Sequence, residues 1–434
     1  MGFALIGASG RRRGPRCFTC SGPGTVQSPS YLDKMRQTAA ISAGKLAVNS
    51  AARSRVEVLT QIGKAEPLWR ELVQQGAICS RYQHYSWMSC WWDHIGSIAQ
   101  ASPHVTVLRD ETDKPALLLP LVRKQLGPIH VGFFMGGKHA NFNLPVWRPA
   151  LLKEPADGLN ALLNGLCHNG PRLDLLVLLN QPETWQGEVN PMLYAPHMAS
   201  ASRVYGGDLQ NDFEALIKER MGANSREKLR QKERQLAAVG PVSYTRARTS
   251  AEIDRVLDAF FQQKAARMRE SGLSNGFDVP GVKEFTAAAA HGIDPDTGEP
   301  IIELYAASAG DTIIATFGGI AAHGRFSGMF NSIAGSEFRD YSPGELLLSR
   351  VVRSCCERGF DRFDLGIGDT AYNQVYCNAA ESLYDSVIPI TKAGHVAAPF
   401  WRGGLALKSK VKQSDALLRG VRSIQQLMSK RAAA

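Results

Sequence analysis

The sequence predicts a mixed α/β fold made of two related halves. Short runs of β-forming residues alternate with helical patterns, and the same order of elements occurs in both halves. "GPRLDL" at 170–175 and "GFDRFDL" at 359–365 each end a predicted helix and open a predicted strand, which indicates an internal repeat. The hydrophobic content of 44% in 434 residues is enough for a full core in two or three domains.

The first half is expected to begin with a strand and to continue through helices into a β-rich part. The predicted elements are a strand at 56–60, helices at 64–75 and 86–96, β-type runs at 104–110, 116–124 and 129–137, a helix at 157–170 and a strand at 172–180.

The second half repeats this order. The predicted elements are a strand at 241–248, helices at 250–272 and 280–291, β-type runs at 301–308, 312–323 and 325–334, a helix at 343–358 and a strand at 362–368. Apolar residues at helical spacing, such as Ile253, Val256 and Phe260, support the helix at 250–272.

The formal net charge of +10 is located at the two ends of the chain. Residues 1–55 contribute +8 and residues 400–434 contribute +7, which leaves −5 for the middle. Nucleic acid is therefore not expected as the main partner of the folded part. Composition predicts five segments: a disordered basic segment at 1–55, an N-terminal domain at 56–215, a basic helical arm at 216–240, a C-terminal domain at 241–398 and a basic amphipathic tail at 399–434.

The cysteines and the N-terminus predict a cytoplasmic protein without a metal site. Cys17 and Cys20 form one CxxC with no second pair, and the other cysteines are scattered in apolar contexts typical of reduced thiols. "MGFALIGASG" precedes the basic run "RRRGPR", which is the reverse of a secretory signal. The basic tail leaves two alternatives open, packing on the protein or lying on the inner membrane as a peripheral helix.

The stretch "SPGE" predicts a helix start with two alternative roles. Ser342 suits the N-cap, Pro343 the first helical position and Glu345 the third, which together make a capping box. Gly344 is not needed for a cap and leaves room for a ligand to approach the backbone. The free N–H groups of Gly344 and Leu346 can then contact an anion such as a phosphate.

"RFDLGIGDTAYNQ" at 362–374 places a strand end beside polar residues. Ligands in α/β folds bind at such ends, and Gly368 removes a side chain there. Asp369 and Tyr372 are candidates for proton transfer, although Asp369 suits equally the N-cap of a following short helix.

Other candidate residues lie in a loop, on a helix and in the basic arm. "GGKHANFNLP" at 136–145 carries Lys138, His139 and Asn141, which are candidates for substrate binding or for a structural loop. Lys264 and Arg267 lie about one turn apart on the helix at 250–272 and form a basic face. In the arm, Asn224 and Glu227 have the spacing of a capping pair. The arm is interpreted as a solvated helix or as a surface for an anionic substrate or RNA.

Taken together, these motifs resemble the GNAT acyltransferases, and in particular the CelD-like acetyltransferases linked to cellulose biosynthesis, which are related to the Fem-type aminoacyl transferases. The resemblance covers roughly residues 56–395. It is based on "YQHYSWMSCWW" (82–92), "GGKHANFNLP" (136–145), "SREKLRQKERQLAAVG" (225–240), "YSPGELLL" (341–348), "FDLGIGDTAYNQ" (363–374) and "SLYDSVIP" (382–389).

The resemblance implies two tandem GNAT-like domains, the second of which binds acetyl-CoA or another acyl-CoA. The pantetheine arm is then expected along the strand that contains Phe330, Asn331 and Ser332, and the pyrophosphate beside the helix start at 342–346. An amine of a small molecule, polysaccharide or peptide attacks the thioester directly, without a metal. The sequence departs from the family at Asn373, where relatives carry a lysine.

Three hypotheses follow for the function. The first is an acyl-CoA-dependent N-acyltransferase in cell-envelope or exopolysaccharide biosynthesis. The second is an aminoacyl-tRNA-dependent ligase, favoured by the basic arm at 216–240. The third is a non-catalytic accessory protein of polysaccharide synthesis at the membrane, favoured by the basic tail at 399–434.

Overall fold

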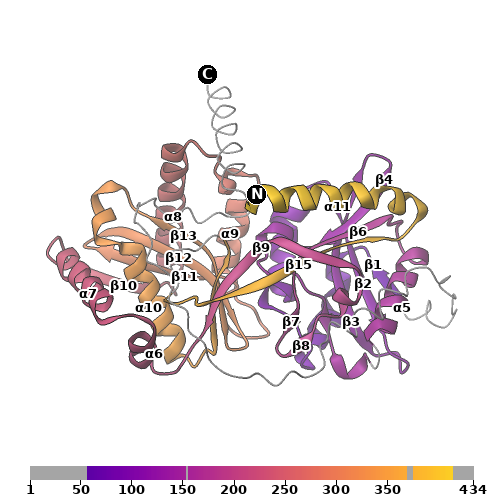
Figure 1. Ribbon diagram of the computed structural model, residues 1–434, viewed down its shortest axis with the longest axis horizontal. Coiled ribbons are helices and arrows are strands. Elements are labelled where there is room, and N and C mark those ends of the chain that lie inside the picture. Colours follow the sequence, from indigo (N-terminus) through magenta and orange to yellow (C-terminus); the bar gives the residue numbers. More distant parts are fainter. Residues whose placement is uncertain (1–55, 153–154, 369–374, 414–434) are drawn as a thin grey trace, which may run out of the picture.

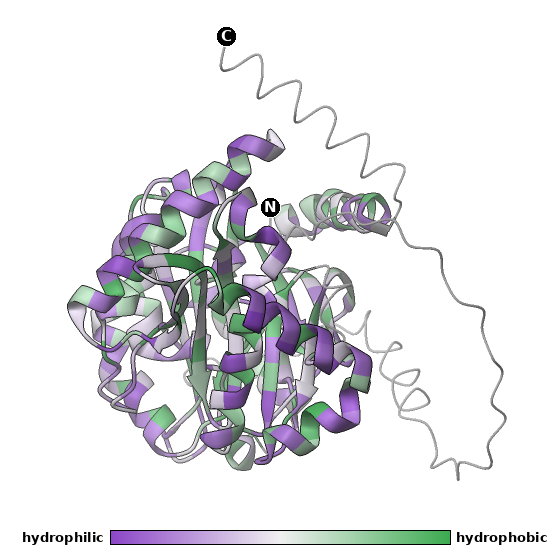
Figure 2. Cartoon of the chain, turned by 90° about the vertical axis from the view of Figure 1, so that its left-hand side faces the viewer, coloured by the Kyte–Doolittle hydropathy of each residue, from purple (hydrophilic) through white to green (hydrophobic). Residues whose placement is uncertain are grey.

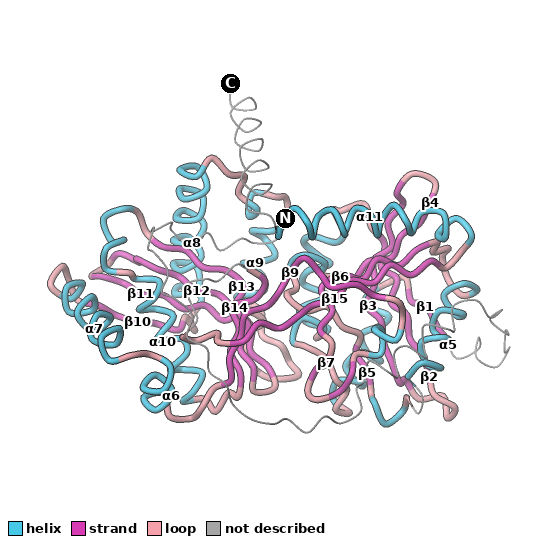
Figure 3. The backbone as a smooth tube through the Cα atoms, in the orientation of Figure 1, coloured by secondary structure: helices cyan, strands magenta, loops and turns pink. Residues whose placement is uncertain are grey.

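The computed structural model describes residues 56–152, 155–368 and 375–413, and it confirms the mixed α/β class. Its main feature is a mixed sheet that runs without interruption through both halves (Figures 1 and 3). The order of its strands is β1-β2-β3-β4-β6-β15-β9-β14-β13-β12-β11-β10, with the short β5 beside β3. Helices cover both faces of this sheet.

The first half contains most of the elements that its sequence predicts. They are β1 (Val56–Leu59), α3 (Ile62–Gln74), α4 (Tyr85–Trp91), β2 (Ser102–Arg109), β3 (Pro115–Leu126), β4 (Ile129–Phe134), β5 (Val146–Trp147), α5 (Pro155–His168), β6 (Leu175–Pro182) and β9 (His197–Asp208), with the small hairpin β7 (Thr184–Trp185) and β8 (Glu188–Val189). β9 was not predicted, because "HMASASRVYGGD" is mostly polar and small and lacks a clear apolar alternation.

The second half begins with two helices and then repeats the pattern of the first. Its elements are α6 (Phe213–Arg220), α7 (Ala223–Ala237), β10 (Val242–Arg246), α8 (Ser250–Ser271), α9 (Val282–His291), β11 (Glu303–Ala309), β12 (Thr312–Ala322), β13 (Arg325–Ile333), α10 (Pro343–Glu357), β14 (Arg362–Ile367), β15 (Ala379–Pro389) and α11 (Lys392–Gln413).

Both halves contain the same β–α–β crossover, which explains the repeated sequence motif. β4, α5 and β6 correspond to β13, α10 and β14, and in each case the two strands pair in parallel. Asp174 and Asp364 occupy the same place in the motif, and both side chains are fully buried. The repeat predicted from "GPRLDL" and "GFDRFDL" is therefore present in the structure.

The two halves exchange their last strands. β9 follows β6 in the chain but pairs with β14, whereas β15 follows β14 but pairs with β6. β9 and β15 also pair with each other in antiparallel orientation, and both cross the middle of the molecule (Figure 1). Separating the halves would break backbone pairing in both, so we expect them to unfold together.

The helices of the second half cover opposite faces of its sheet. On one face α8 packs through Phe260 against Phe330 of β13, with a ring separation of 4.6 Å. On the other face Leu347 and Val351 of α10 lie in one cluster with Phe326. Phe326 and Phe330 are four residues apart and enter different cores, because a β-bulge opposite Gly318 and Gly319 shifts the alternation of β13 by one residue.

Helix ends are partly as predicted. Thr249 and Glu252 form a capping box at the start of α8, and Gly272 ends this helix in the left-handed conformation. The predicted capping pair of Asn224 and Glu227 is wrong, because α7 begins two residues earlier. Its N-cap is Gly222, and Glu227 pairs instead with Arg234 at 2.6 Å.

Candidate functional site

The strands β13 and β14 separate after a short parallel contact. They pair from Arg325–Ser327 to Arg362–Asp364, and beyond this point β14 bends away. Gly366 makes the bend, since its φ of 72° lies in the left-handed region and a Cβ there would lie 2.5 Å from the Gly328 carbonyl oxygen. The result is a V-shaped opening between two neighbouring strands.

Asn141 of the predicted 136–145 loop closes the narrow end of this opening. Its Nδ2 donates to the Gly328 carbonyl at 2.9 Å, and its Oδ1 accepts from the Ile367 N–H at 3.3 Å. Nδ2 also donates to the Tyr82 hydroxyl at 2.7 Å. A side chain from the first half therefore replaces one rung of backbone pairing between two strands of the second half.

A buried carboxylate fixes the paired part of the two strands. Asp364 accepts from Arg325 Nε and Ser327 Oγ, both at 2.7 Å, and from the Gly366 N–H at 2.9 Å. These bonds connect β13, β14 and the glycine bend, so the width of the opening is set by fully satisfied polar groups.

In the described part of the chain, the outer part of β13 has one edge without a neighbouring strand. The Ala334 N–H donates to the Ile314 carbonyl, and residues alternate in antiparallel pairing, so Phe330 and Ser332 also turn their backbone groups towards β12. The backbone groups of Asn331 and Ile333 consequently face the opening. Lys264 confirms this direction, because its Nζ lies 3.5 Å from the Asn331 carbonyl oxygen.

Of the three strand residues predicted for the donor, only Asn331 offers groups to the opening. The Phe330 ring packs in the core, and the Ser332 hydroxyl bonds to Thr316 at 2.6 Å and to Gln263 at 2.7 Å. The sequence could not show which of these three residues faces the opening. The alternation of the strand was clear, but its unpaired edge depends on where the pairing of β13 with β14 ends.

Lys264 and Arg267 lie in different surroundings although they share a helix. Burial lowers the pKa of Lys264, and no carboxylate of the described residues lies within salt-bridge distance of its ammonium group. Arg267 is partly exposed and lies 3.7 Å from Glu270. Lys264 is therefore the candidate for an anionic or polar ligand group in the opening, and Arg267 belongs to the surface.

The predicted capping box at the start of α10 is wrong. Ser342 adopts the left-handed conformation with φ of 51° at the end of a 3-10 helix, η8 (Ser336–Tyr341), and its side chain makes no cap. The N–H groups of Glu345 and Leu346 both donate to the Ser342 carbonyl, at 3.0 and 3.2 Å. Leu346 is thus not a free donor, and Gly344 keeps the one N–H of this first turn that lacks a partner among the described residues.

Gly344 also packs closely against Ile333. A Cβ at this position would lie 3.0 Å from Cδ1 of Ile333, whose side chain is 45% exposed at the end of β13. The start of α10 therefore lies directly beside the open end of β13.

Lys232 of α7 was not predicted as a site residue, yet it lies at the start of α10. Its Nζ donates to the Ser342 hydroxyl. α7 is almost entirely hydrophilic along its visible length in Figure 2. The helical part of the basic arm thus brings a positive charge to the place where the sequence predicts a phosphate, a proximity that only long-range packing creates.

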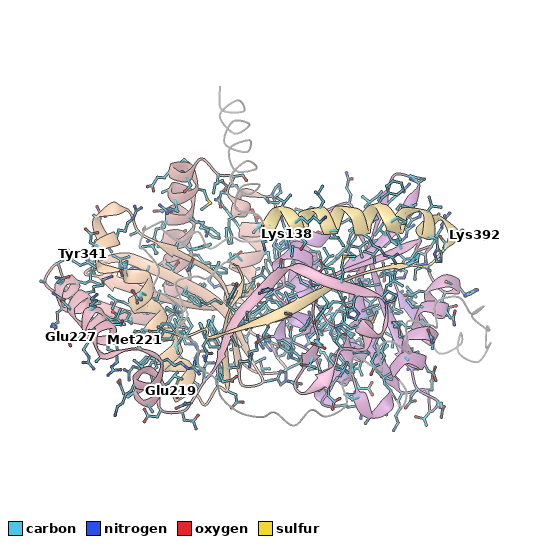
Figure 4. The ribbon with its side chains drawn as sticks, in the orientation of Figure 1. Lys138, Glu219, Met221, Glu227, Tyr341 and Lys392 are labelled. Carbon is cyan, nitrogen blue, oxygen red and sulfur yellow. The ribbon has the colours of Figure 1, made fainter. Side chains whose placement is uncertain are left out.

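The 136–145 loop carries two further predicted residues. Lys138 is exposed, and Figure 4 places it below the left-hand end of α11. His139 is buried, and its Nδ1 accepts from the Trp91 indole N–H at 3.1 Å. Burial, with a smaller effect of Lys138, lowers the pKa of His139 to about 4, so this imidazole is neutral at pH 7.

A narrow pocket adjoins the point where the two strands separate. It is lined by His139 and Asn141 together with mostly apolar residues of β13 and of the α8–α9 region, among them Phe277, Phe285 and Met329. A wider cleft lies at the paired end of β13, where Arg81, Arg325 and Tyr384 line it.

The corresponding opening in the first half is filled by its own loop. β4 and β6 pair only from Val131–Phe133 to Leu175–Val177. Beyond this contact Asn143 donates through Nδ2 to the Leu179 carbonyl at 3.0 Å and through its N–H to the Asn180 carbonyl at 3.1 Å. Asn143 is only 1% exposed, so this opening is occupied by protein.

Some predicted residues lie outside the described part of the chain. They are Asp369 and Tyr372, with Asn373 of the same motif, and also Cys17 and Cys20. Gly368 is the last described residue before this gap and follows β14 directly.

One group of described side chains has the spacing of a metal site. Ligand atoms of His84, Asp294 and Asp296 lie within 4.8 Å of one another. Arg81 bonds to Asp294, and Arg70 contacts Asp296 at 2.6 Å. Two guanidinium groups neutralise the carboxylates, so we interpret the group as an ion-pair network between the halves.

One known domain family matches part of the chain. Residues 223–374 match the family described as the acetyltransferase (GNAT) domain. This segment contains α7 through β14, with Lys264, the start of α10 and the two strands beside the opening. The match therefore assigns a GNAT-type acetyltransferase domain to this segment. No curated protein matches the chain.

Solved structures are similar to this chain at low sequence identity. FemX is 9% identical with a TM-score of 0.50, and the match covers 74% of this chain and 96% of that chain. A tandem GNAT protein from the clavulanic acid biosynthesis pathway is 10% identical with a TM-score of 0.40, over 77% and 98%. The L-PGS structure from Bacillus licheniformis is 12% identical with a TM-score of 0.42, over 72% and 93%.

The GNAT part of the predicted resemblance is confirmed for residues 223–374, and the mixed sheet with its repeated β–α–β crossover is consistent with two GNAT-like domains. The CelD-like branch and the predicted segment boundaries stay predictions.

Proposed function

We propose that this protein is an N-acyltransferase that transfers an acyl group, acetyl being the simplest, from acyl-CoA to an amine. One observation carries the proposal: the free edge of β13 at Asn331 and Ile333 faces an opening that ends at the N-terminus of α10. An extended amide-containing chain can pair with the edge of β13 while its phosphate approaches the N-terminus of α10.

The dimensions suit an extended donor. From Met329 to Ile333 the strand covers about 13 Å at roughly 3.3 Å per residue. The amides of a pantetheine arm would exchange hydrogen bonds with the backbone of Asn331 and Ile333. Its phosphate would then lie near the Gly344 N–H and the Lys232 ammonium, which together provide one hydrogen bond and a full positive charge.

The thioester would lie at the narrow end, next to Asn141 and the pocket beside Met329. The amine attacks the thioester carbonyl, a C–N bond forms, the C–S bond breaks, and the thiolate takes up a proton. The proton that the amine loses requires a base, for which Asp369 and Tyr372 remain the candidates from the sequence. His139 is a poor candidate, since its Nδ1 already accepts from Trp91.

Direct binding tests the donor assignment. Calorimetry with acetyl-CoA and CoA should show binding to the wild type and a loss of at least tenfold in Gly344→Val, whose side chain would displace Ile333 and cover the free N–H. Gly63→Val is the matched control, because nothing lies within 4 Å of a Cβ there. Folded wild type that fails to bind at millimolar ligand would refute the proposal.

An aminoacyl-tRNA donor is the second candidate function, favoured by the basic exposed face of α7 next to the opening. Lys228 and Arg230 are exposed and are suited to testing it, whereas Arg226 donates to the Met221 carbonyl and has a structural role. If tRNA is the donor carrier, Lys228→Glu with Arg230→Glu should weaken salt-dependent tRNA binding and leave CoA binding unchanged.

From the resemblance to CelD-like acetyltransferases we further propose an acceptor amine from cell-envelope or exopolysaccharide chemistry. Mass spectrometry of small molecules retained on the native protein tests this, and an amine-free retained ligand in the pocket would argue against it.

A further inference from the structure

Helix α11 is apolar on two opposite sides. Its inner side packs on the sheet, where Ala398, Trp401 and Leu405 contact a small core cluster with Val177 and Val387. Its outer side carries Val396, Phe400 and Leu407, which are 70%, 79% and 62% exposed. A surface helix that packs on a sheet usually has one apolar face and one polar face. The apolar residues on the outer side of α11 therefore indicate a binding surface.

The three exposed residues form one stripe along the helix. At about 100° per residue they lie within about 40° of one another, and Gly403 falls on the same line. Figure 1 shows α11 lying along the upper edge of the first half, and Figure 4 places Lys392 at its right-hand end. The stripe therefore lies on the surface of the molecule, where its three side chains are exposed.

The charge around the stripe is of one sign. α11 contains five Lys and Arg and no Asp or Glu. The Arg402 side chain is partly buried against the sheet, where it donates to the Val387 carbonyl at 2.9 Å. Lys392, Lys408 and Lys410 are exposed and lie on both sides of the stripe, roughly 60–100° from its centre. Residues 414–434 continue the sequence with four more basic residues and one acid.

We propose that the outer face of α11 docks this protein on an anionic membrane surface. Exposed Phe and Leu side chains would enter the interface between headgroups and acyl chains, while lysines on both sides would contact anionic headgroups. No described helix combines the length and apolar character needed to cross a membrane. The absence of acids in α11 favours a lipid surface over a second copy of the same basic helix, because two such faces would repel each other.

Vesicle co-sedimentation of the full chain tests the proposal. The wild type should bind vesicles that contain phosphatidylglycerol and phosphatidylcholine. Its affinity for vesicles of phosphatidylcholine alone should be at least tenfold lower. Val396→Ser, Phe400→Ser and Leu407→Ser together should reduce binding at least tenfold. All three side chains are exposed, so the variant should keep the wild-type circular dichroism spectrum and unfolding midpoint. Val239→Ser is the control for a similarly exposed apolar residue, at 56%.

A second variant separates local charge from net charge. Lys392→Glu, Lys408→Glu and Lys410→Glu should abolish binding, whereas the equally charged Lys64→Glu, Lys114→Glu and Lys218→Glu should keep most of it. Truncation after residue 413 should retain binding. The proposal would be overturned if the wild type did not bind anionic vesicles, or if the serine variant bound them as the wild type does. A concentration-dependent dimer that the serine variant loses, without any vesicle binding, would also overturn it.

Discussion

Asn141 and Asn143 provide a matched test of the site, because each amide closes one of the two V-shaped openings. Asn141 makes three hydrogen bonds, to Gly328, Ile367 and Tyr82, at 2.7–3.3 Å. Asn143 donates through its side chain to Leu179 at 3.0 Å and to Gly137 at 3.3 Å. Both are replaced by alanine, which removes the amide and leaves the backbone unchanged.

Both variants should lose stability to a similar extent. Taking about 1 kcal/mol net for each lost hydrogen bond, with more where a buried backbone group keeps no partner, gives a loss of about 2–4 kcal/mol in the free energy of unfolding. Urea denaturation measures this quantity, and the slope should stay unchanged in both variants.

Donor binding should separate them. Asn141 borders the proposed thioester position, so Asn141→Ala should weaken CoA and acetyl-CoA binding at least tenfold, or about 1.4 kcal/mol, in calorimetry. Asn143→Ala should bind the donor as the wild type does, since its opening is filled by protein. Equal effects of the two variants on donor affinity, in either direction, would refute the assignment of the donor to the second half.

Three further predictions concern buried charged or polar groups. His104 is fully buried in β2 with neither ring nitrogen bonded among the described residues, and burial, with a smaller effect of Arg123, lowers its pKa to about 4. The unfolded state therefore binds more protons than the folded state between about pH 6.5 and 4, and the wild type loses stability as the pH falls through this range. His104→Leu should raise the free energy of unfolding and remove up to about 3 kcal/mol of this pH-dependent loss in denaturation experiments. An unchanged pH profile would contradict this. Asp294→Ala should cost about 3–5 kcal/mol in urea denaturation, because it leaves Arg81 and His84 buried without their carboxylate, and a loss under 1 kcal/mol would show that the network is dispensable. Lys264→Met should keep the unfolding midpoint or raise it, because the lysine pKa is lowered by burial, but should reduce donor affinity measured by calorimetry; normal affinity would remove Lys264 from the site.

Most elements could be predicted because their signals are local. The helix at 250–272 shows apolar residues at helical spacing and ends at a glycine, and the observed α8 differs by one residue. β9 and β15 were not predicted, because strands that lie between two halves take their stability from partners distant in the sequence. The cap at Ser342 was wrong for a related reason: the preceding 3-10 helix and Lys232 determine its conformation.

The sequence by itself determined the mixed α/β class, the internal repeat and the regions of the candidate site, since periodicity, glycines and motif spacing are properties of neighbouring residues. Tertiary structure decided which of those residues meet. It brought Asn141 of the first half into the opening of the second and turned the backbone groups of Asn331 and Ile333 away from β12. It also placed Lys232 beside α10 and exposed the outer face of α11. These contacts depend on strand exchange and helix packing across the two halves, and such distances are not encoded in any local pattern.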